Sequence, residues 1–146
     1  LSLMLFGVAT VIGNLLGGRL ADTLGTRRAL QVVLVGLAFS LAALPFTASQ
    51  ASAMFANLFA WGVFAFAISP IVQAGVVATA QAEAPDAVGT ASGFNIAAFN
   101  LGIAAASFVG GILVAGPGLL VTPWAALGAT LVALAIVQRS GRVSRA

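Results

Sequence analysis

The chain has 146 residues, of which 61% are hydrophobic and 6% are charged. A soluble domain carries roughly a quarter charged residues, so this composition excludes an ordinary water-soluble protein. There is no Cys and no His, and the only acids are Asp22, Glu83 and Asp86, all of which we expect in loops. This set offers no proton shuttle, no catalytic dyad and no metal centre. The sequence therefore predicts neither an enzyme nor a cofactor.

The positive charge of the chain comes from six Arg, which fall in two clusters beside apolar segments. Nucleic-acid binding would need basic residues spread over a wetted surface. Arg clusters at the edges of apolar runs are instead typical of membrane proteins. The predicted partner is thus a lipid bilayer, not a nucleic acid.

Five apolar runs are close to the length of about 20 residues that crosses a bilayer as a helix. Barrel strands alternate apolar and polar residues, and these runs do not. The predicted fold class is therefore all-α, a polytopic membrane helix bundle whose backbone groups are satisfied within each helix. The expected spans are residues 1–17, 29–46, 53–80, 91–115 and 119–138, followed by a basic tail at 139–146.

The Arg residues also predict the orientation of the bundle. With five spans, the turn at 18–28 and the tail at 139–146 lie on the same side, and together they hold all six Arg. The turns at 47–52 and 116–122 lie on the other side and hold none. The positive-inside rule makes the Arg-rich side cytoplasmic. Because the chain would then begin outside, within a helix and without Met, we interpret it as the C-terminal piece of a longer protein.

Small residues predict where helices pack closely, since membrane helices associate through such residues. A pair with Gly-x-x-x-Gly spacing occurs in the first span, and a line that repeats every four residues occurs in the fourth. Plain packing and a sliding contact that changes during a functional cycle both fit this pattern. The residues are Gly13 and Gly17 in the first span, and Ala98, Gly102, Ala106 and Gly110 in the fourth.

Polar residues within a membrane tend to face the bundle interior or a wet cavity. Their distribution predicts that spans one, three and four are interior and that spans two and five face lipid. Asn95 shares a face with the small-residue line, so we expect it to bond a neighbouring helix. Asn100 lies near the midplane and about 140° away around the helix, so we expect it in a cavity. The candidate cavity residues are Asn57, Trp61, Gln73 and Asn100, and for each amide the alternative is a simple interhelical hydrogen bond.

The charged turn Gly18-Arg19-Leu20-Ala21-Asp22-Thr23-Leu24-Gly25-Thr26-Arg27-Arg28 resembles the loop signature of the major facilitator superfamily of secondary transporters. The segments at 69–73 and 91–103 strengthen the likeness, especially to the drug:proton antiporter branch and its sugar and purine-nucleoside exporters. The turn departs from the fuller motif at Thr23 and Thr26, where basic residues are common. That departure weakens a full charge-relay role for the loop.

The resemblance implies twelve spans in two halves, of which these five would be the eighth to twelfth, with the ninth and twelfth peripheral. It also implies that Gly18, Arg19, Asp22, Gly25, Arg27 and Arg28 form a gating motif. Asp22 is expected at the start of the second helix. There it acts either as a cap that favours the positive end of the helix dipole or as a latch between the two halves.

The leading functional hypothesis is proton-coupled export of small molecules, such as drugs, sugars or nucleoside-like metabolites, across a bacterial inner membrane. No acid lies within a span, so the proton-carrying group is expected in the missing N-terminal half. The alternative is a metabolite uniporter or importer of the same fold. A membrane enzyme or structural subunit would be expected to show embedded acids, His or a cofactor motif, and the sequence has none.

Overall fold

The structure, a computed structural model, describes residues 2–143. Within this range it is all helical, without a strand, and five of its helices are long and apolar enough to cross a membrane. The predicted fold class is confirmed. The elements in chain order are α1 (Ser2–Leu24), α2 (Thr26–Thr47), α3 (Ala51–Glu83), the short 3₁₀ helix η1 (Pro85–Ala87), α4 (Val88–Ala115), the 3₁₀ helix η2 (Leu119–Val121) and α5 (Thr122–Val143).

The helices are longer than the expected spans. The expected turn at 18–28 is helical except at Gly25, and the expected loop at 81–90 is reduced to Ala84 and η1. Residues 139–143 of the expected tail continue α5, and the rest of the tail lies outside the described residues. The physical reason is that a helix needs only its own backbone bonds and good helix formers, so it continues past the point where apolar residues end.

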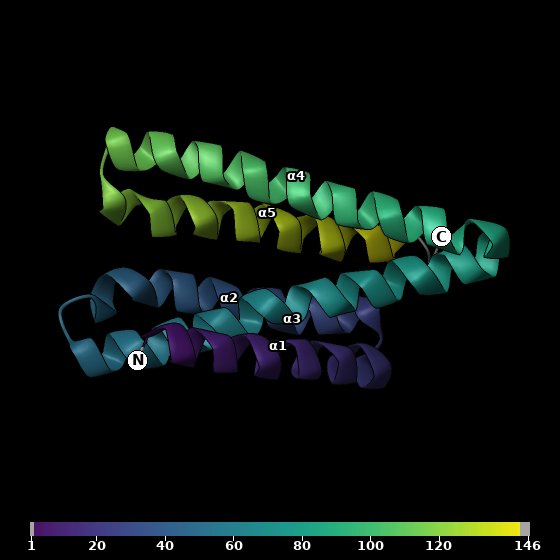
Figure 1. Cartoon of the computed structure of the whole chain (residues 1–146), viewed down its shortest axis with the longest axis horizontal. Helices are drawn as coiled ribbons and strands as arrows, with labels where there is room; N and C mark the ends of the chain where they lie inside the picture. The colour runs from purple at the N-terminus through teal and green to yellow at the C-terminus, as the bar shows by residue number, and fades with distance from the viewer. Residues whose placement is uncertain (1, 144–146) are drawn as a thin grey trace.

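Successive helices run in opposite directions, as Figure 1 shows. The α1–α2 junction, the α3–η1–α4 junction and the end of α5 therefore lie at one end of the bundle. The turn at 48–50 and the linker at 116–121 lie at the other end. Arg19, Arg27, Arg28 and Arg139 thus gather at the same end as all three acids.

The buried core lies among α1, α2 and α3. Ala29 and Val33 of α2 and Ala67 and Ile71 of α3 have no exposed surface. Partly buried apolar residues of α1, α2 and α3 pack around these four: Leu20, Ala21, Leu30, Phe64 and Ile68. Alternating small and large side chains let α2 and α3 approach and interdigitate, which is the main source of helix association in a bilayer.

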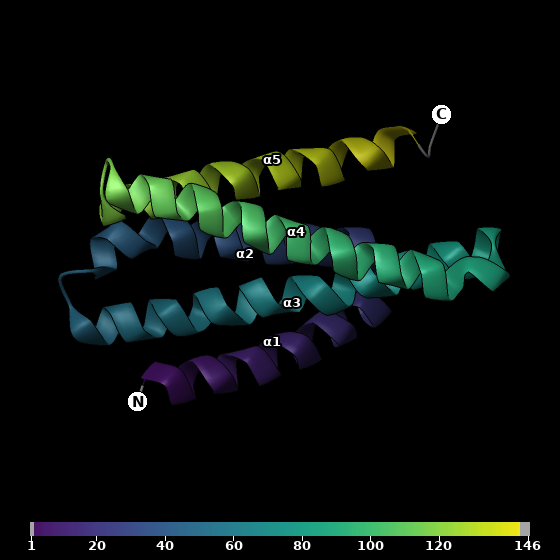
Figure 2. The same cartoon turned by 45° about the horizontal axis from the view of Figure 1, so that its top comes forward.

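That the second span faces lipid stays a prediction, because one face of α2 is packed while Val32, Phe39 and Phe46 are exposed. α2 packs against both α3 and α5 and contains six buried residues, whereas α4 contains none. Figure 2 shows α4 and α5 diverging from their shared linker, so that α4 has little of this chain beside it.

Glycines permit the close contact between α1 and α3. A Cβ at Gly13 would lie 2.5 Å from the Val63 carbonyl oxygen, and one at Gly17 would lie 2.7 Å from Cγ of Pro70. No such contact occurs in α4, where Gly102 and Gly110 have open space around their Cα atoms, and Ala98 and Ala106 are exposed. The small-residue line of α4 therefore has no partner helix within the described residues.

Candidate functional site

The charged motif forms a sharp junction between two helices. Gly25 has φ 75° and ψ 154°, a conformation that non-glycine residues rarely adopt. Its N–H donates to the Ala21 carbonyl, and its own carbonyl accepts from Ala29, each at 3.0 Å. Asp22 lies in the last turn of α1, not at the start of α2 as the sequence predicted. The capping interpretation fails, because a carboxylate there is near the negative end of the α1 dipole.

Arg27, in the first turn of α2, holds the last turns of α5. Its Nε donates to the Val137 carbonyl at 3.2 Å, and its Nη2 donates to the Gln138 carbonyl at 2.9 Å. A guanidinium on the carbonyl-rich end of a helix is favourable for both hydrogen bonding and the dipole. The structure therefore brings one motif residue to the end of α5. In the described residues, Arg19 and Arg28 make no side-chain hydrogen bond to another helix, and a Cβ at Gly18 would have nothing within 4 Å.

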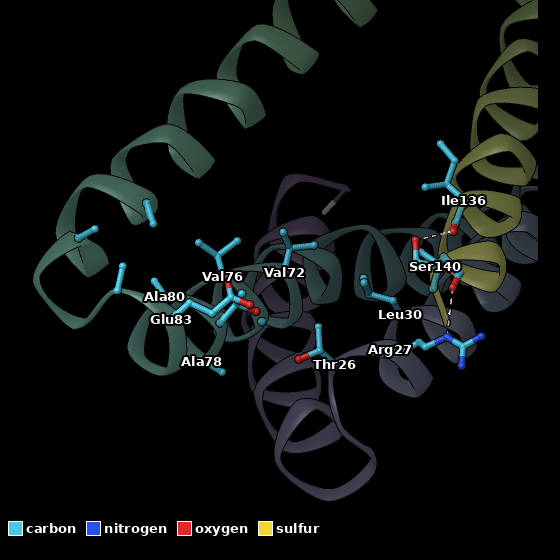
Figure 3. Close-up of a pocket in the computed structure, with 16 residues that line it drawn as sticks. Thr26, Arg27, Leu30, Val72, Val76, Ala78, Ala80, Glu83, Ile136 and Ser140 are labelled. Carbon is cyan, nitrogen blue, oxygen red and sulfur yellow. Dashed lines mark hydrogen bonds between the residues drawn. The ribbon is translucent and has the colours of Figure 1, made fainter. Parts of the chain in front are cut away.

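A cavity of about 850 Å³ opens at this same end of the bundle. Its walls are mostly apolar and come from α2, α3, the start of α4 and the end of α5. Figure 3 shows Arg27 reaching toward the end of α5, with Glu83 of α3 on the other side. No ion pair joins them in the part of the chain that the structure describes. Since most of its lining residues are apolar, this cavity suits an apolar segment of protein better than a polar solute.

A second cavity, of about 510 Å³, lies between α3 and α4. The sequence predicted that Asn95 and Asn100 point to different surroundings, but both line this cavity. The reason is that the cavity runs along one side of α4 and is wide enough to reach both residues, although they lie about 140° apart around the helix. Its lining residues are Ser69, Gln73, Asn95, Ile96, Phe99 and Asn100.

A hydrogen bond ties the two walls of this smaller cavity together. Nδ2 of Asn95 donates to Oε1 of Gln73 at 2.6 Å, so the half-buried amides join α4 to α3. Asn100 is exposed and lies near the middle of the 28-residue α4. The two walls together present neutral amides, a hydroxyl and an aromatic ring, and none of the lining residues is charged.

Two predicted cavity residues lie elsewhere. Nδ2 of Asn57 donates to the Ser40 carbonyl at 3.1 Å and to Oγ1 of Thr47 at 3.3 Å, so its amide links α3 to α2. This bond supports α2 next to Pro45, where the helix lacks a backbone donor. Trp61 stacks on Phe6 of α1, with ring centroids 6.0 Å apart. Both were misplaced because polarity alone does not say which helix a residue faces.

The sequence reasoning missed Ser69, Ile96 and Phe99 as lining residues. The spacing of these residues along their helices could have identified two of them. Ser69 and Gln73 are four residues apart, as are Asn95 and Phe99, so each pair lies on one helix face. Each of the two neighbouring helices thus contributes a pair of residues, one turn apart, to the lining of the cavity.

Comparisons with known proteins agree with this architecture. Residues 1–144 match the profile of the Major Facilitator Superfamily. The chain is 37% identical over 132 residues to the uncharacterised MFS-type transporter YtbD of Bacillus subtilis (strain 168), covering 90% of this chain and 33% of that protein. It is 38% identical over 136 residues to the inner membrane transport protein YdhP of Escherichia coli (strain K12), covering 92% and 33%. No solved structure gives a significant match.

Proposed function

The chain belongs to the major facilitator superfamily, and from this premise we propose that it forms part of a proton-coupled exporter of small molecules in a bacterial inner membrane. It is a multi-pass membrane protein and a transporter chain, not an enzyme. It spans about a third of the length of the curated relatives that it matches. The activity of the whole protein is therefore the subject of the proposal.

The smaller cavity is the observation that carries the proposal. Transporters bind substrate near the middle of the membrane, between helices of different repeats. Here an opening of about 510 Å³ combines amides with Phe99 and Ile96, and it lies beside the middle of α4. Small-molecule sites have volumes of about 300–1,000 Å³ and a few polar groups in an apolar wall. This arrangement suits an uncharged solute with some apolar surface.

Proton coupling requires a carboxylate near the substrate site that can take up and release a proton. All three acids of this chain lie at one end of the bundle, far along the helices from Asn100. A carboxylate that takes up and releases the coupled proton must then lie in a segment outside this chain. The length of the relatives leaves ample room for such a segment, including the proposed N-terminal half.

The small contact between α4 and α5 supports the same view of a longer polypeptide. In this superfamily each half is built from two inverted three-helix repeats. α3 packs along both α1 and α2, whereas α4 and α5 barely touch. If α1 and α2 end one repeat and α3, α4 and α5 form the other, a helix that precedes α1 would pack against α4 and α5. We propose that it fills the cavity of about 850 Å³.

For Asp22 we propose the role of a latch. Its carboxylate is exposed at the end of α1, beside Gly25, and no salt bridge engages it in the described residues. A partner in the other half would hold it in one state and release it in another. A difference of a few kcal/mol between states is sufficient for such a switch.

Transport driven by an imposed pH gradient tests the proposal. The full-length protein that carries this chain would be reconstituted in liposomes and loaded with candidate solutes. An exporter should move solute against its gradient when protons flow the opposite way. Movement that follows the solute gradient regardless of pH would identify a uniporter, and solute moving in the same direction as protons would identify a coupled importer.

A further inference from the structure

The hydrogen bond between Asn95 and Gln73 narrows the ligand chemistry of the smaller cavity. A primary amide offers two N–H donors and an oxygen acceptor. The observed bond uses one Asn95 donor and the Gln73 oxygen. No second bond joins these side chains in the described residues, so Nε2 of Gln73 remains a donor and Oδ1 of Asn95 remains an acceptor.

The free donor of Gln73 and the free acceptor of Asn95 are not fully enclosed by protein. Gln73 and Asn95 are half-buried, and in the described part of the chain no fully enclosed side-chain nitrogen or oxygen lacks a partner. Since Nε2 and Oδ1 have no protein partner, neither atom is fully enclosed, and both belong to residues that line the cavity. Phe99 lines the same space and is 37% exposed, so part of its ring is available.

Resting on the proposed transport function, we propose that this cavity binds an uncharged cyclic amide. The ligand carbonyl accepts from Nε2 of Gln73, and the adjacent ligand N–H donates to Oδ1 of Asn95. The planar ring packs on Phe99. An ionic ligand is disfavoured because no lining residue carries a charge to replace its lost hydration.

The two bonds also tie ligand binding to helix position. Gln73 belongs to α3 and Asn95 to α4, so a ligand that engages both is held by two helices at once. A ligand that engages only one would gain about half of the polar contact. We therefore expect the N–H donor of the ligand to matter as much as its carbonyl.

Uridine and N3-methyluridine are the test pair, because they differ only in the methyl group that removes the donor of the cyclic imide. Isothermal titration on the purified full-length protein should show uridine binding about tenfold more tightly, the loss expected for one hydrogen bond with its desolvated partner. Methyl riboside, which has the sugar and no ring amide, should not bind measurably.

Three variants locate the effect. Asn95→Leu should bind both nucleosides equally weakly, because it removes the acceptor of the ligand N–H. Gln73→Met should weaken the binding of both nucleosides and keep the preference for uridine, because it removes only the donor to the ligand carbonyl. Gln81→Met makes the same change on α3 outside the cavity and should retain the tenfold preference. Melting midpoints would show that each variant is folded. Equal binding of the two nucleosides by the unaltered protein, or tight binding of methyl riboside, would overturn the proposal even if a variant fails to fold.

The outcome is separable from that of the transport experiment. A protein that prefers uridine but shows no pH-driven transport would contradict the exporter and leave the cyclic-amide site in place. A protein that transports solutes under a pH gradient but does not distinguish the two nucleosides would contradict the site alone.

Discussion

Gly13 and Gly17 show how the absence of a side chain fixes a helix pair. They lie one turn apart on α1 and leave room for Val63, Phe66, Ala67 and the ring of Pro70 on α3. In a bilayer such contact is the chief gain from association, because lipid tails are as apolar as Leu side chains. Each methyl group added here must displace backbone atoms, which do not yield as a flexible side chain would.

Gly13→Ala should therefore destabilise the full-length protein. The added Cβ would lie 2.5 Å from the Val63 carbonyl oxygen, and overpacking of this kind costs about 1–3 kcal/mol. The melting midpoint in detergent measures the effect. Gly7→Ala is the matched control, since it changes the same helix at a point with nothing within 4 Å. Equal midpoints for the two variants would show that α1 and α3 do not meet as described.

The ends of the helices are joined by specific contacts as well as by short linkers. Arg27 at the start of α2 spans a sequence separation of 110 residues to reach α5. At the same end, Gly75 allows α3 to pass close to Thr26 of α2. A Cβ added at Gly75 would lie 2.7 Å from Cγ2 of Thr26. The start of α2 thus packs closely against α3 at Gly75 and is hydrogen-bonded to α5 through the Arg27 guanidinium.

Arg27→Gln should loosen the end of α5. The change removes a charge from the negative end of the helix dipole and at least one of two hydrogen bonds. Because Arg27 is exposed, we expect a loss of only about 0.3–1 kcal/mol. Hydrogen exchange of the last turns of α5 should rise in Arg27→Gln and not in Arg28→Gln, its neighbour without such a contact. A similar rise in both variants would mean that net charge, not the capping bond, holds α5.

At the scale of the whole molecule, the sequence predicted what depends on composition and missed what depends on neighbours. Five apolar runs and clustered Arg were sufficient for an all-helical membrane bundle. Asn57 and Trp61 were expected in a cavity yet contact α2 and α1, because polarity does not specify which helix face meets which partner. Asp22 was misplaced by helix continuation through the motif, which only the special φ of Gly25 finally interrupts.

The orientation of the bundle follows from its ends. Arg19, Arg27, Arg28 and Arg139 share one end, and the turn at 48–50 lies at the other. We expect a reporter fused after Ala146 of the full-length protein to report the cytoplasm, and one inserted after Ser49 to report the periplasm. The opposite pair of signals would invert the proposed topology, and two signals of one kind would contradict the alternation of the helices.

The cavity at the Arg-rich end of the bundle yields the last prediction, because a helix that fills it can be crosslinked. Ile136 lines the cavity of about 850 Å³, whereas its neighbour Ala135 is exposed and does not. A photoreactive benzoylphenylalanine at position 136 of the full-length protein should crosslink to a peptide that precedes residue 1 in the chain. The same residue at position 135, at equal depth on another face, should capture mainly phospholipid. Mass spectrometry of the digested products identifies each adduct. Phospholipid or a peptide of α1 to α5 at position 136 would contradict the inverted-repeat argument, because no helix from outside this chain would then lie in the cavity.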